Sequence, residues 1–280
     1  MTAFYEETKA CIDAVFEAHA PSEVTLTLDA TGVNGHVQLL VLSIIGYQRL
    51  TQLKRVNAIS GSCYAYLVYH ALNTTGIEGL GAIMQRWDSN MRRHFHKTRV
   101  LKTLAKLPMA AVGKGNIFNP QCLEAMLRGT VNDHNANRPL STVPDNAVFW
   151  VYNQTRGCPV GLNARGEYQD YSMAELARTF AAIPKLYGAA KLGDDWFIDP
   201  VFSKDYSALR TALKKDAKPG HHIYSNIAFA KQTPNITYIK THQYGDGKRM
   251  VVADFIKLML NIPNRKIYHA FQQANIPFSK

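Results

Sequence analysis

Two consecutive strand–turn–helix units near the start of the chain constrain its fold more than any other feature. In the first unit, residues 24–28 have the pattern of a strand, 29–35 form a turn, and 36–50 form a strongly apolar helix. In the second, residues 56–59 are a strand, and a turn of small residues leads into a helix from 64 to about 72. This order is typical of a mostly parallel sheet with helices on its faces, so we expect an α/β fold.

The rest of the chain continues the mixture of helices and strands. We expect further helices at 3–19, over most of 77–130, and at 173–182, 206–215 and 251–274. Further strands are expected at 147–152, 167–171, 196–198, 222–230 and 236–239. Because repeats, low-complexity segments and linkers are all lacking in the sequence, residues 1–280 are expected to form a single domain.

Composition narrows the class of protein. The 280 residues are 46% hydrophobic, enough for a sizeable core, and the formal charge is +11. The basic residues are scattered and form no standard nucleic-acid motif, so we expect no nucleic-acid partner. No apolar run reaches the roughly 18 residues of a membrane span, which leaves only peripheral membrane contact.

The N-terminal residues and the cysteines indicate the cellular compartment of the protein. Residues 1–20 carry several charged side chains and have the pattern of a surface helix, not of a signal peptide. The four cysteines are widely spaced and form no C-x-x-C pair. A reducing compartment is the simplest interpretation, so we expect a cytoplasmic protein.

The turn between residues 59 and 67 has the features of a nucleophile elbow, usually written G-x-S-x-G. Three side chains compete for the central position: Ser60, Ser62 and Cys63. An elbow needs small residues two places to either side, and Cys63 has Gly61 and Ala65 there. The pattern therefore favours a thiol in place of the usual hydroxyl.

The two serines fit the elbow less well in sequence. Ser62 has the bulky Tyr64 two places on, whereas Ser60 has small neighbours but would place the turn before the expected start of the helix. We expect the positive end of that helix to lower the pKa of the Cys63 thiol and favour the thiolate. Another interpretation of Cys63 is a small buried residue at a strand end, since free cysteines are commonly buried.

Two further segments suit an acyl-transfer site beside this elbow. Residues 29–35 form a small-residue turn before a helix, where free backbone N–H groups can hold a developing oxyanion. Asp199 ends an apolar strand and could act as a base toward a nearby nucleophile. Another interpretation of Asp199 is an N-cap ahead of Pro200.

Together the three segments resemble the patatin-like acyl hydrolase family, whose motifs are D-G-G-G-x-R-G, G-x-S-x-G and D-G-G or D-G-A. The resemblance covers about residues 24–205 and includes the approach to the aspartate, residues 181–187. The first motif matches at Asp29, Gly32 and Gly35 and departs at Ala30, Thr31 and Asn34, and Pro200 replaces the glycine after the aspartate.

The resemblance implies a three-layer, patatin-like α/β sandwich, with residues 220–280 as C-terminal strands and helices of the same domain. It also implies a two-residue mechanism in which Asp takes the proton of the nucleophile. By position, Cys63 would be the nucleophile and Asp199 the base. Backbone N–H groups of Ala30, Thr31 and Gly32 would form the oxyanion hole. No cofactor is implied.

The function expected from this resemblance is lipid acyl hydrolysis of the phospholipase A type. A cysteine nucleophile forms a thioester, which favours transfer to amines, thiols or carbon nucleophiles over hydrolysis. The first alternative is therefore a Cys-dependent acyltransferase or condensing enzyme that uses acyl thioesters or an acyl carrier protein. A second alternative is an inactive lipid- or acyl-carrier-binding protein, because several motif positions have changed.

Two other patterns remain. Basic side chains alternate with apolar ones from residue 94 to 107, which predicts a basic amphipathic helix. This helix could bind an anionic membrane, a phosphopantetheine carrier or a phospholipid headgroup. The other interpretation is a solvated helix face. The pair His221-His222 lacks a third ligand in sequence, so we expect no metal site.

Overall fold

A single mixed sheet forms the centre of the molecule in the computed structural model, which describes residues 2–31, 35, 37–76, 79–95, 118, 121–184, 186–226, 235–240 and 274. The strand order is β5-β6-β3-β2-β1-β7-β8, and β4 also pairs with β3. The five strands from β3 to β8 in this order are parallel, whereas β4, β5 and β6 are antiparallel to their neighbours. The strands are β1 Thr25–Leu28, β2 Arg55–Ile59, β3 Ala147–Asn153, β4 Cys158–Leu162, β5 Ala190–Leu192, β6 Asp195–Ile198, β7 His222–Asn226 and β8 Thr237–Lys240.

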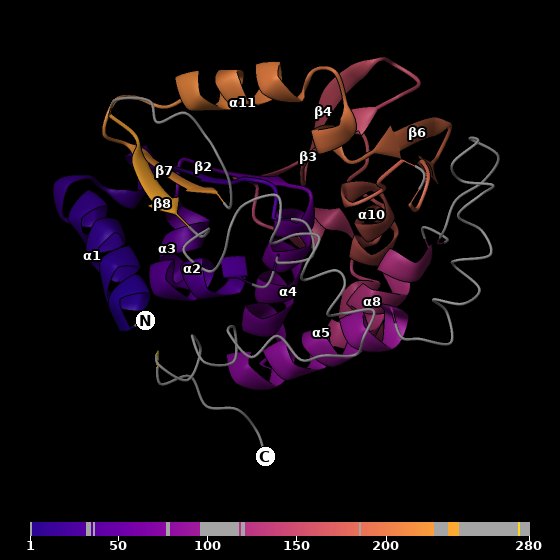
Figure 1. Cartoon of the computed structure of the whole chain (residues 1–280), viewed down its shortest axis with the longest axis horizontal. Helices are drawn as coiled ribbons and strands as arrows, with labels where there is room; N and C mark the ends of the chain where they lie inside the picture. Colours follow the sequence, from indigo (N-terminus) through magenta and orange to yellow (C-terminus); the bar gives the residue numbers. More distant parts are fainter. Residues whose placement is uncertain are drawn as a thin grey trace.

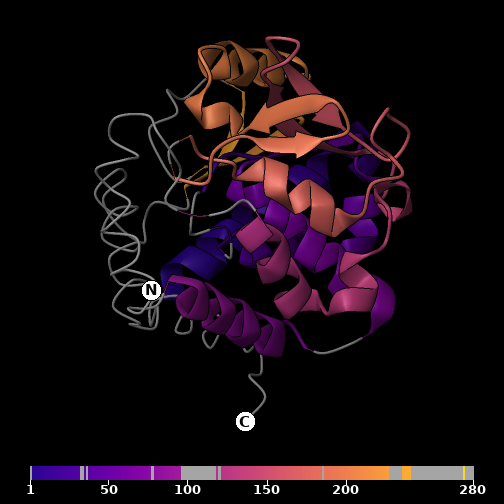
Figure 2. The same cartoon turned by 90° about the vertical axis from the view of Figure 1, so that its right-hand side faces the viewer.

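Helices cover both faces of this sheet (Figures 1 and 2). Helix α11, orange in the figures, lies on one face with the short 3-10 helix η4 packed beside it, and the larger helical layer lies on the other. The α-helices are α1 Thr2–Ala18, α2 Val37–Ile45, α3 Tyr47–Gln52, α4 Gly61–Thr75, α5 Leu80–Phe95, α8 Gln121–Val131, α9 Asp133–Ala136, α10 Met173–Phe180 and α11 Tyr206–Lys215. Short 3-10 helices are η1 Pro21–Glu23, η3 Leu140–Thr142 and η4 Pro200–Phe202.

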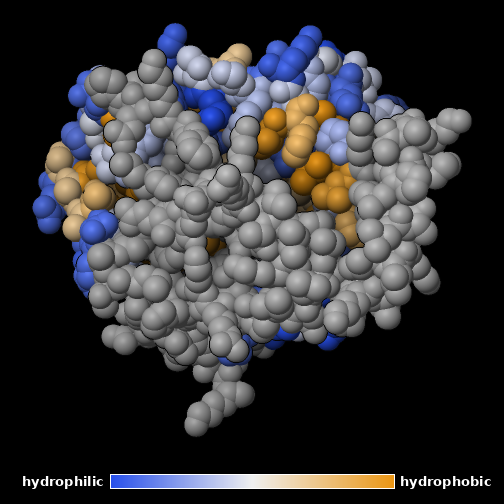
Figure 3. Space-filling view, in the orientation of Figure 1, coloured by the Kyte–Doolittle hydropathy of each residue, from blue (hydrophilic) through white to orange (hydrophobic). Residues whose placement is uncertain are grey.

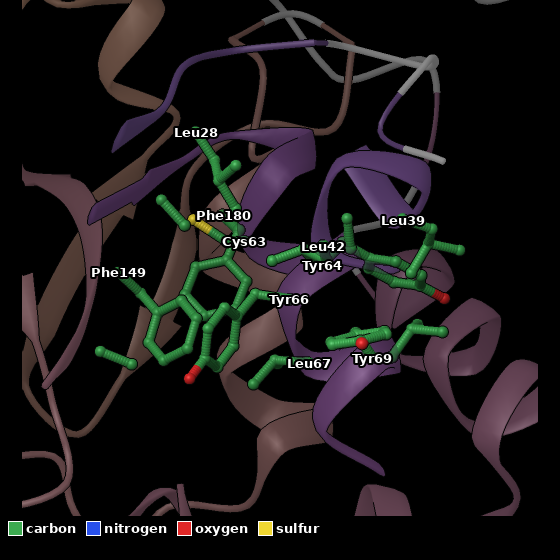
Figure 4. Packing of buried hydrophobic residues seen from close by; sticks show 14 of the residues in the cluster. Leu28, Leu39, Leu42, Cys63, Tyr64, Tyr66, Leu67, Tyr69, Phe149 and Phe180 are labelled. Carbon is green, nitrogen blue, oxygen red and sulfur yellow. The ribbon is translucent and has the colours of Figure 1, made fainter. Parts of the chain in front are cut away.

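The central strands are buried on both faces, as expected for a parallel sheet between helices. All four residues of β1 and the last four of β2 are buried. Helix α4 is buried from Gly61 to Ala71 because it lies against the sheet and also packs on α2, α8 and α10. Figure 4 shows the aromatic part of this core, where Tyr66, Phe149 and Phe180 lie close together. The carboxyl end of β2 therefore leads directly into a helix that is buried in the apolar core.

The expected α/β class with a mostly parallel central sheet is confirmed. One expected strand, 167–171, is wrong: these residues form turns, and the strand that pairs with β3 in a hairpin is β4. The expected helix at 36–50 is divided at Gly46, whose φ of 82° lies in the left-handed region that glycine adopts without a steric penalty. The single-domain organisation stays a prediction.

Helix α4 begins at Gly61, three residues earlier than expected. None of the helices in the described part of the chain is both long and apolar enough to cross a membrane. All but the last residue of the expected helix at 251–274, most of the expected basic helix at 94–107 and the end of the expected strand at 222–230 lie outside the described residues.

Candidate active site

The junction of β2 and α4 contains a residue in an unusual backbone conformation. Ser60 has φ 58° and ψ −131°, between the last residue of β2 and the first residue of α4. A non-glycine residue in such a region costs about 1–3 kcal/mol, and such residues cluster at functional sites. The sharp strand-to-helix turn of an elbow is therefore centred on Ser60.

Strand register brings Ser60 and Asp199 to opposite sides of one residue of β3. Ile59 is paired with Trp150 in the parallel ladder, so the next residue, Ser60, comes beside Val151. Ile198 is paired with Tyr152 in the antiparallel ladder, so Asp199 also comes beside Val151. Two positions 139 residues apart in sequence thus meet across one strand.

The two side chains form a short, buried hydrogen bond. The Ser60 hydroxyl donates to Asp199 Oδ2 at 2.5 Å, and the Val201 N–H donates to Asp199 Oδ1 at 3.0 Å. Ser60 is 3% exposed and Asp199 is 1% exposed. The N-cap interpretation of Asp199 is therefore confirmed, because one carboxylate oxygen caps η4, while the other oxygen accepts from the serine.

Burial is the main cause of a shifted pKa at Asp199. Removal from water raises the pKa of this carboxyl from 3.8 to about 7, against the lowering effect of the hydrogen bonds from Ser60 and Val201. The negative charge of Asp29 raises it further. A carboxylate with a pKa near neutrality is suited to take a proton from a hydroxyl and return it within one catalytic cycle.

Cys63 does not occupy the position that the sequence predicts for it. It lies in the first turn of α4, is 0% exposed, and packs in the core near Phe180 and Tyr66 (Figure 4). Burial, and then the charge of Asp199, raises the pKa of its thiol well above the ordinary value. The expected lowering by the helix end is therefore wrong, because loss of solvation outweighs the helix dipole.

The argument against Ser60 in sequence also fails in the structure. We expected a turn at Ser60 to come before the helix, but α4 begins at the very next residue. Residues Ala58 and Ser62, two places to either side of Ser60, are both small, as an elbow requires. The backbone geometry thus favours Ser60 over Cys63, which the sequence pattern had favoured.

Ser62 has a different role, which is to hold the loop after β1. Its hydroxyl donates to the Asp29 carbonyl oxygen at 2.5 Å and lies 3.3 Å from the Thr31 hydroxyl. These contacts connect the first turn of α4 to residues 29–31. The Ser62 hydroxyl is therefore engaged in structure and is not paired with Asp199 among the described contacts.

The backbone N–H groups expected to form the oxyanion hole differ in their availability. The Ala30 N–H donates to Asp29 Oδ1 at 2.8 Å, so this expected donor is already used. The amide of Thr31 has no hydrogen-bond partner among the described residues, and Gly32 lies outside them. The amide of Gly61, the first residue of α4, was missed in sequence and is one of the N–H groups that a helix leaves without an intrahelical partner.

Glycine at position 35 allows the loop after β1 to approach the elbow closely. A methyl group there would lie 2.5 Å from the Gly61 carbonyl oxygen, closer than real side chains come. Gly35 is one of the positions that matches the family motif. The match therefore has a steric cause in this structure, since the loop and the start of α4 touch at this point.

Near Ser60 and Asp199, three side chains that the sequence did not indicate hold the carboxylate of Asp29. Tyr206 donates to its Oδ1 at 2.6 Å, Tyr224 donates to its Oδ2 at 2.9 Å, and Arg210 forms an ion pair with it at 2.9 Å. Burial and the negative Asp29 raise the pKa values of both tyrosines, which stay neutral donors. No local pattern links these residues to position 29, since α11 and β7 lie more than 170 residues later.

No family model matches the chain, and no curated protein matches it. Function is therefore inferred from the geometry of Ser60, Asp199 and the loop after β1, and from the resemblance of three short motifs to those of patatin-like acyl hydrolases.

Proposed function

We propose that the chain is an acyl hydrolase that forms a covalent acyl-enzyme at Ser60, with Asp199 as the general base. The observation that carries this proposal is the hydrogen bond from Ser60, in its strained conformation, to a buried carboxylate whose pKa is about 7. A nucleophile within hydrogen-bond reach of its base is the arrangement that covalent catalysis requires.

The reaction proceeds in two balanced steps. The Ser60 oxygen attacks the ester carbonyl carbon while its proton passes to Asp199, and the tetrahedral intermediate then expels the alcohol, which takes that proton. Water attacks the acyl-enzyme in the second step, gives its proton to Asp199, and releases the acid as the proton returns to Ser60. The amides of Gly61 and Thr31 are the donors we assign to the oxyanion.

The resemblance to patatin-like acyl hydrolases supports this proposal when it is aligned on Ser60. The letters around the elbow become Ala58-Ile59-Ser60-Gly61-Ser62, with the hydroxyl in the central position. The nucleophile is then the family's own residue type, and the pair Ser60–Asp199 replaces the pair Cys63–Asp199. The family-level fold and membership remain part of the proposal.

A lipid ester is the substrate class that we propose. Trp196 and Phe202, on either side of Asp199 in sequence, are 46% and 52% exposed and are the large apolar side chains most open to solvent in the described part. Hydrophobic residues also reach the surface on the face shown in Figure 3, in the region that α10 and β6 occupy in Figure 1. Exposed apolar groups near a polar site suit an acyl chain or a lipid surface.

The two alternatives from the sequence are weaker after this geometry. The thioester argument for an acyltransferase or an acyl carrier partner required Cys63 as the nucleophile, and its thiol is buried with a raised pKa. An inactive binding protein would have no need of a strained serine on a buried carboxylate.

Hydrolysis of phosphatidylcholine vesicles, followed by the release of fatty acid and lysophospholipid, tests the proposal. We expect turnover by the wild type, a loss of at least about 10⁴-fold in Ser60→Ala, and turnover within about twofold of wild type in Cys63→Ala. Circular dichroism of both variants checks that they fold. Turnover that survives in Ser60→Ala, or a wild type that releases no fatty acid from phospholipids or short-chain esters, would overturn it.

A further inference from the structure

Three side chains that can bind a metal ion lie together at the amino ends of β1 and β7, at the end of the sheet opposite to Ser60. His19 follows α1, Glu23 is the last residue of η1, and His221 directly precedes β7. One ligand atom from each, two imidazole nitrogens and one carboxylate oxygen, lies within 4.8 Å of the others. The three residues lie at the amino ends of β1 and β7, whereas Ser60 and Asp29 follow the carboxyl ends of β2 and β1.

Backbone hydrogen bonds hold all three residues in place. The amide of His19 donates to the Val15 carbonyl at 2.9 Å, and that of Glu23 donates to Ala20 at 2.9 Å. The carbonyl of His221 accepts from the Thr25 amide at 2.8 Å, which ties the start of β7 to the start of β1. The cluster is thus formed by ordered backbone from two distant parts of the chain.

The two imidazoles are arranged side by side. Their rings are stacked, with centroids 3.8 Å apart and an angle of 29° between their planes. Gly220, the residue before His221, has a φ of 82°, and a methyl group there would lie 3.5 Å from His19 Nε2. The turn before His221 therefore passes close to His19, which is 202 residues earlier, and keeps the two rings together.

One nitrogen of this cluster lacks a protein partner. His221 Nδ1 is buried and has no hydrogen bond in the described part of the chain. A buried polar atom without a partner costs about 1–3 kcal/mol. Coordination of a cation through Nδ1 would satisfy it.

The donor set selects the kind of ion. Two neutral imidazoles and one carboxylate suit Zn²⁺, which takes nitrogen and carboxylate oxygen at about 2.0–2.2 Å in tetrahedral geometry, whereas Ca²⁺ and Mg²⁺ prefer oxygen alone. Ligand atoms in such a tetrahedron lie ~3.4 Å apart, so a small rotation of the exposed Glu23 side chain closes the site. A water molecule would complete the coordination.

We propose that His19, Glu23 and His221 bind one Zn²⁺ ion, which joins the end of α1 and η1 to the start of β7. In Figure 1, α1 and β7 lie at the same side of the molecule. The sequence predicted no metal site because His221-His222 has no third ligand nearby; the fold supplies two ligands from residues 19 and 23 instead. His222 takes no part, because its Nε2 lies 2.9 Å from the Thr27 hydroxyl inside the core.

Isothermal titration of the untagged, chelator-treated chain with ZnCl₂ tests this site. We expect one Zn²⁺ per chain, and a melting temperature that rises with Zn²⁺ concentration because the ion binds the folded state. Each of the variants His19→Gln, Glu23→Gln and His221→Gln should weaken binding by at least about tenfold, since each removes one of three protein ligands. Zn²⁺-induced stabilisation should disappear in the same variants.

His134→Gln is the matched control, because His134 is an exposed histidine on α9 outside the cluster. It should bind Zn²⁺ as the wild type does. Glu23→Gln changes an exposed side chain, so it tests the site even if a histidine variant fails to fold. A wild type that binds no Zn²⁺, or binding that is equal in Glu23→Gln and the wild type, would overturn the proposal.

Discussion

The β2–α4 junction and the apolar core next to it bury two nucleophiles in opposite surroundings. Ser60 at the junction is buried and donates to the Asp199 carboxylate, whereas Cys63, three residues later, is buried in the hydrophobic core. Both side chains are close enough to the elbow to match its pattern in sequence. Under the proposed function, a partner and a backbone conformation, and not burial or nucleophile type, distinguish the nucleophile from a packing residue.

Removal of the base should have the largest effect on this difference. Asp199→Asn keeps the shape of the side chain but cannot take the proton of Ser60, so we expect ester hydrolysis to fall by about 10⁴-fold. Steady-state kinetics on a soluble short-chain ester measures the loss. A fall of less than about tenfold would show that Ser60 does not depend on Asp199.

The pH dependence of the wild type should show the ionisation of the same group. Because Asp199 must be ionised to act as a base, kcat/KM should rise about tenfold per pH unit below its pKa of about 7 and level off above it. A flat profile between pH 5 and pH 8, measured with a substrate that does not ionise in that range, would contradict this assignment.

The same shift predicts an effect on folding. The Asp199 carboxyl has a pKa of about 7 in the folded state and about 3.9 in the unfolded state. Between these two pH values the folded state therefore binds more protons than the unfolded state does. The contribution of this group to the free energy of unfolding is full below the unfolded pKa and is lost as pH rises through about 7. Asp199→Asn should remove this slope, which chemical denaturation at several pH values would measure.

The loop after β1 should have an intermediate effect. In Gly35→Ala the added methyl meets the Gly61 carbonyl at 2.5 Å, so the loop must move away from the elbow. We expect about a tenfold loss of kcat and about 1–3 kcal/mol of stability. Gly79→Ala, where an added methyl meets no atom within 4 Å, is the matched control and should change kcat little.

Changes at Cys63 should have the smallest effect on catalysis and a clear effect on stability. Cys63→Ala leaves a small cavity and should cost about 1–2 kcal/mol of the free energy of unfolding. Cys63→Ser places a hydroxyl in apolar surroundings and should cost more. Both variants should keep kcat within about twofold of wild type. A loss of activity in folded Cys63→Ala would restore Cys63 as the nucleophile.

Much of the fold was predictable because its signals are local. The strands β1, β2, β3 and β6 are short segments with several aliphatic, aromatic or β-branched residues, and their order with the helices predicted a mostly parallel sheet. The break at Gly46 and the strand β4 were missed, since the first depends on one backbone angle and the second contains a proline and a glycine that do not favour strands. These errors changed elements without changing the class of fold.

The candidate site was predictable only in part. The sequence located the elbow, Asp199 and the loop at Asp29, because each follows a strand with a small-residue or acidic pattern. It favoured Cys63 as the centre of the elbow, whereas the turn is centred on Ser60. The difference arises because the centre depends on where α4 begins, and helix ends are set by backbone geometry that side-chain size predicts poorly. Tyr206 and Arg210 had no local signal, because their partner Asp29 lies more than 170 residues away, and the same holds for the pairing of His19 with His221.

Covalent labelling of the native protein with a fluorophosphonate, followed by peptide mass spectrometry, tests the assignment of the nucleophile most directly. The reagent modifies an activated serine hydroxyl and forms a stable phosphonyl ester. We predict one adduct on the peptide that contains residues 60–63, with fragment ions that place it on Ser60, and no adduct in Ser60→Ala. An adduct on Ser62 or Cys63, or one that persists in folded Ser60→Ala, would contradict the Ser60–Asp199 dyad.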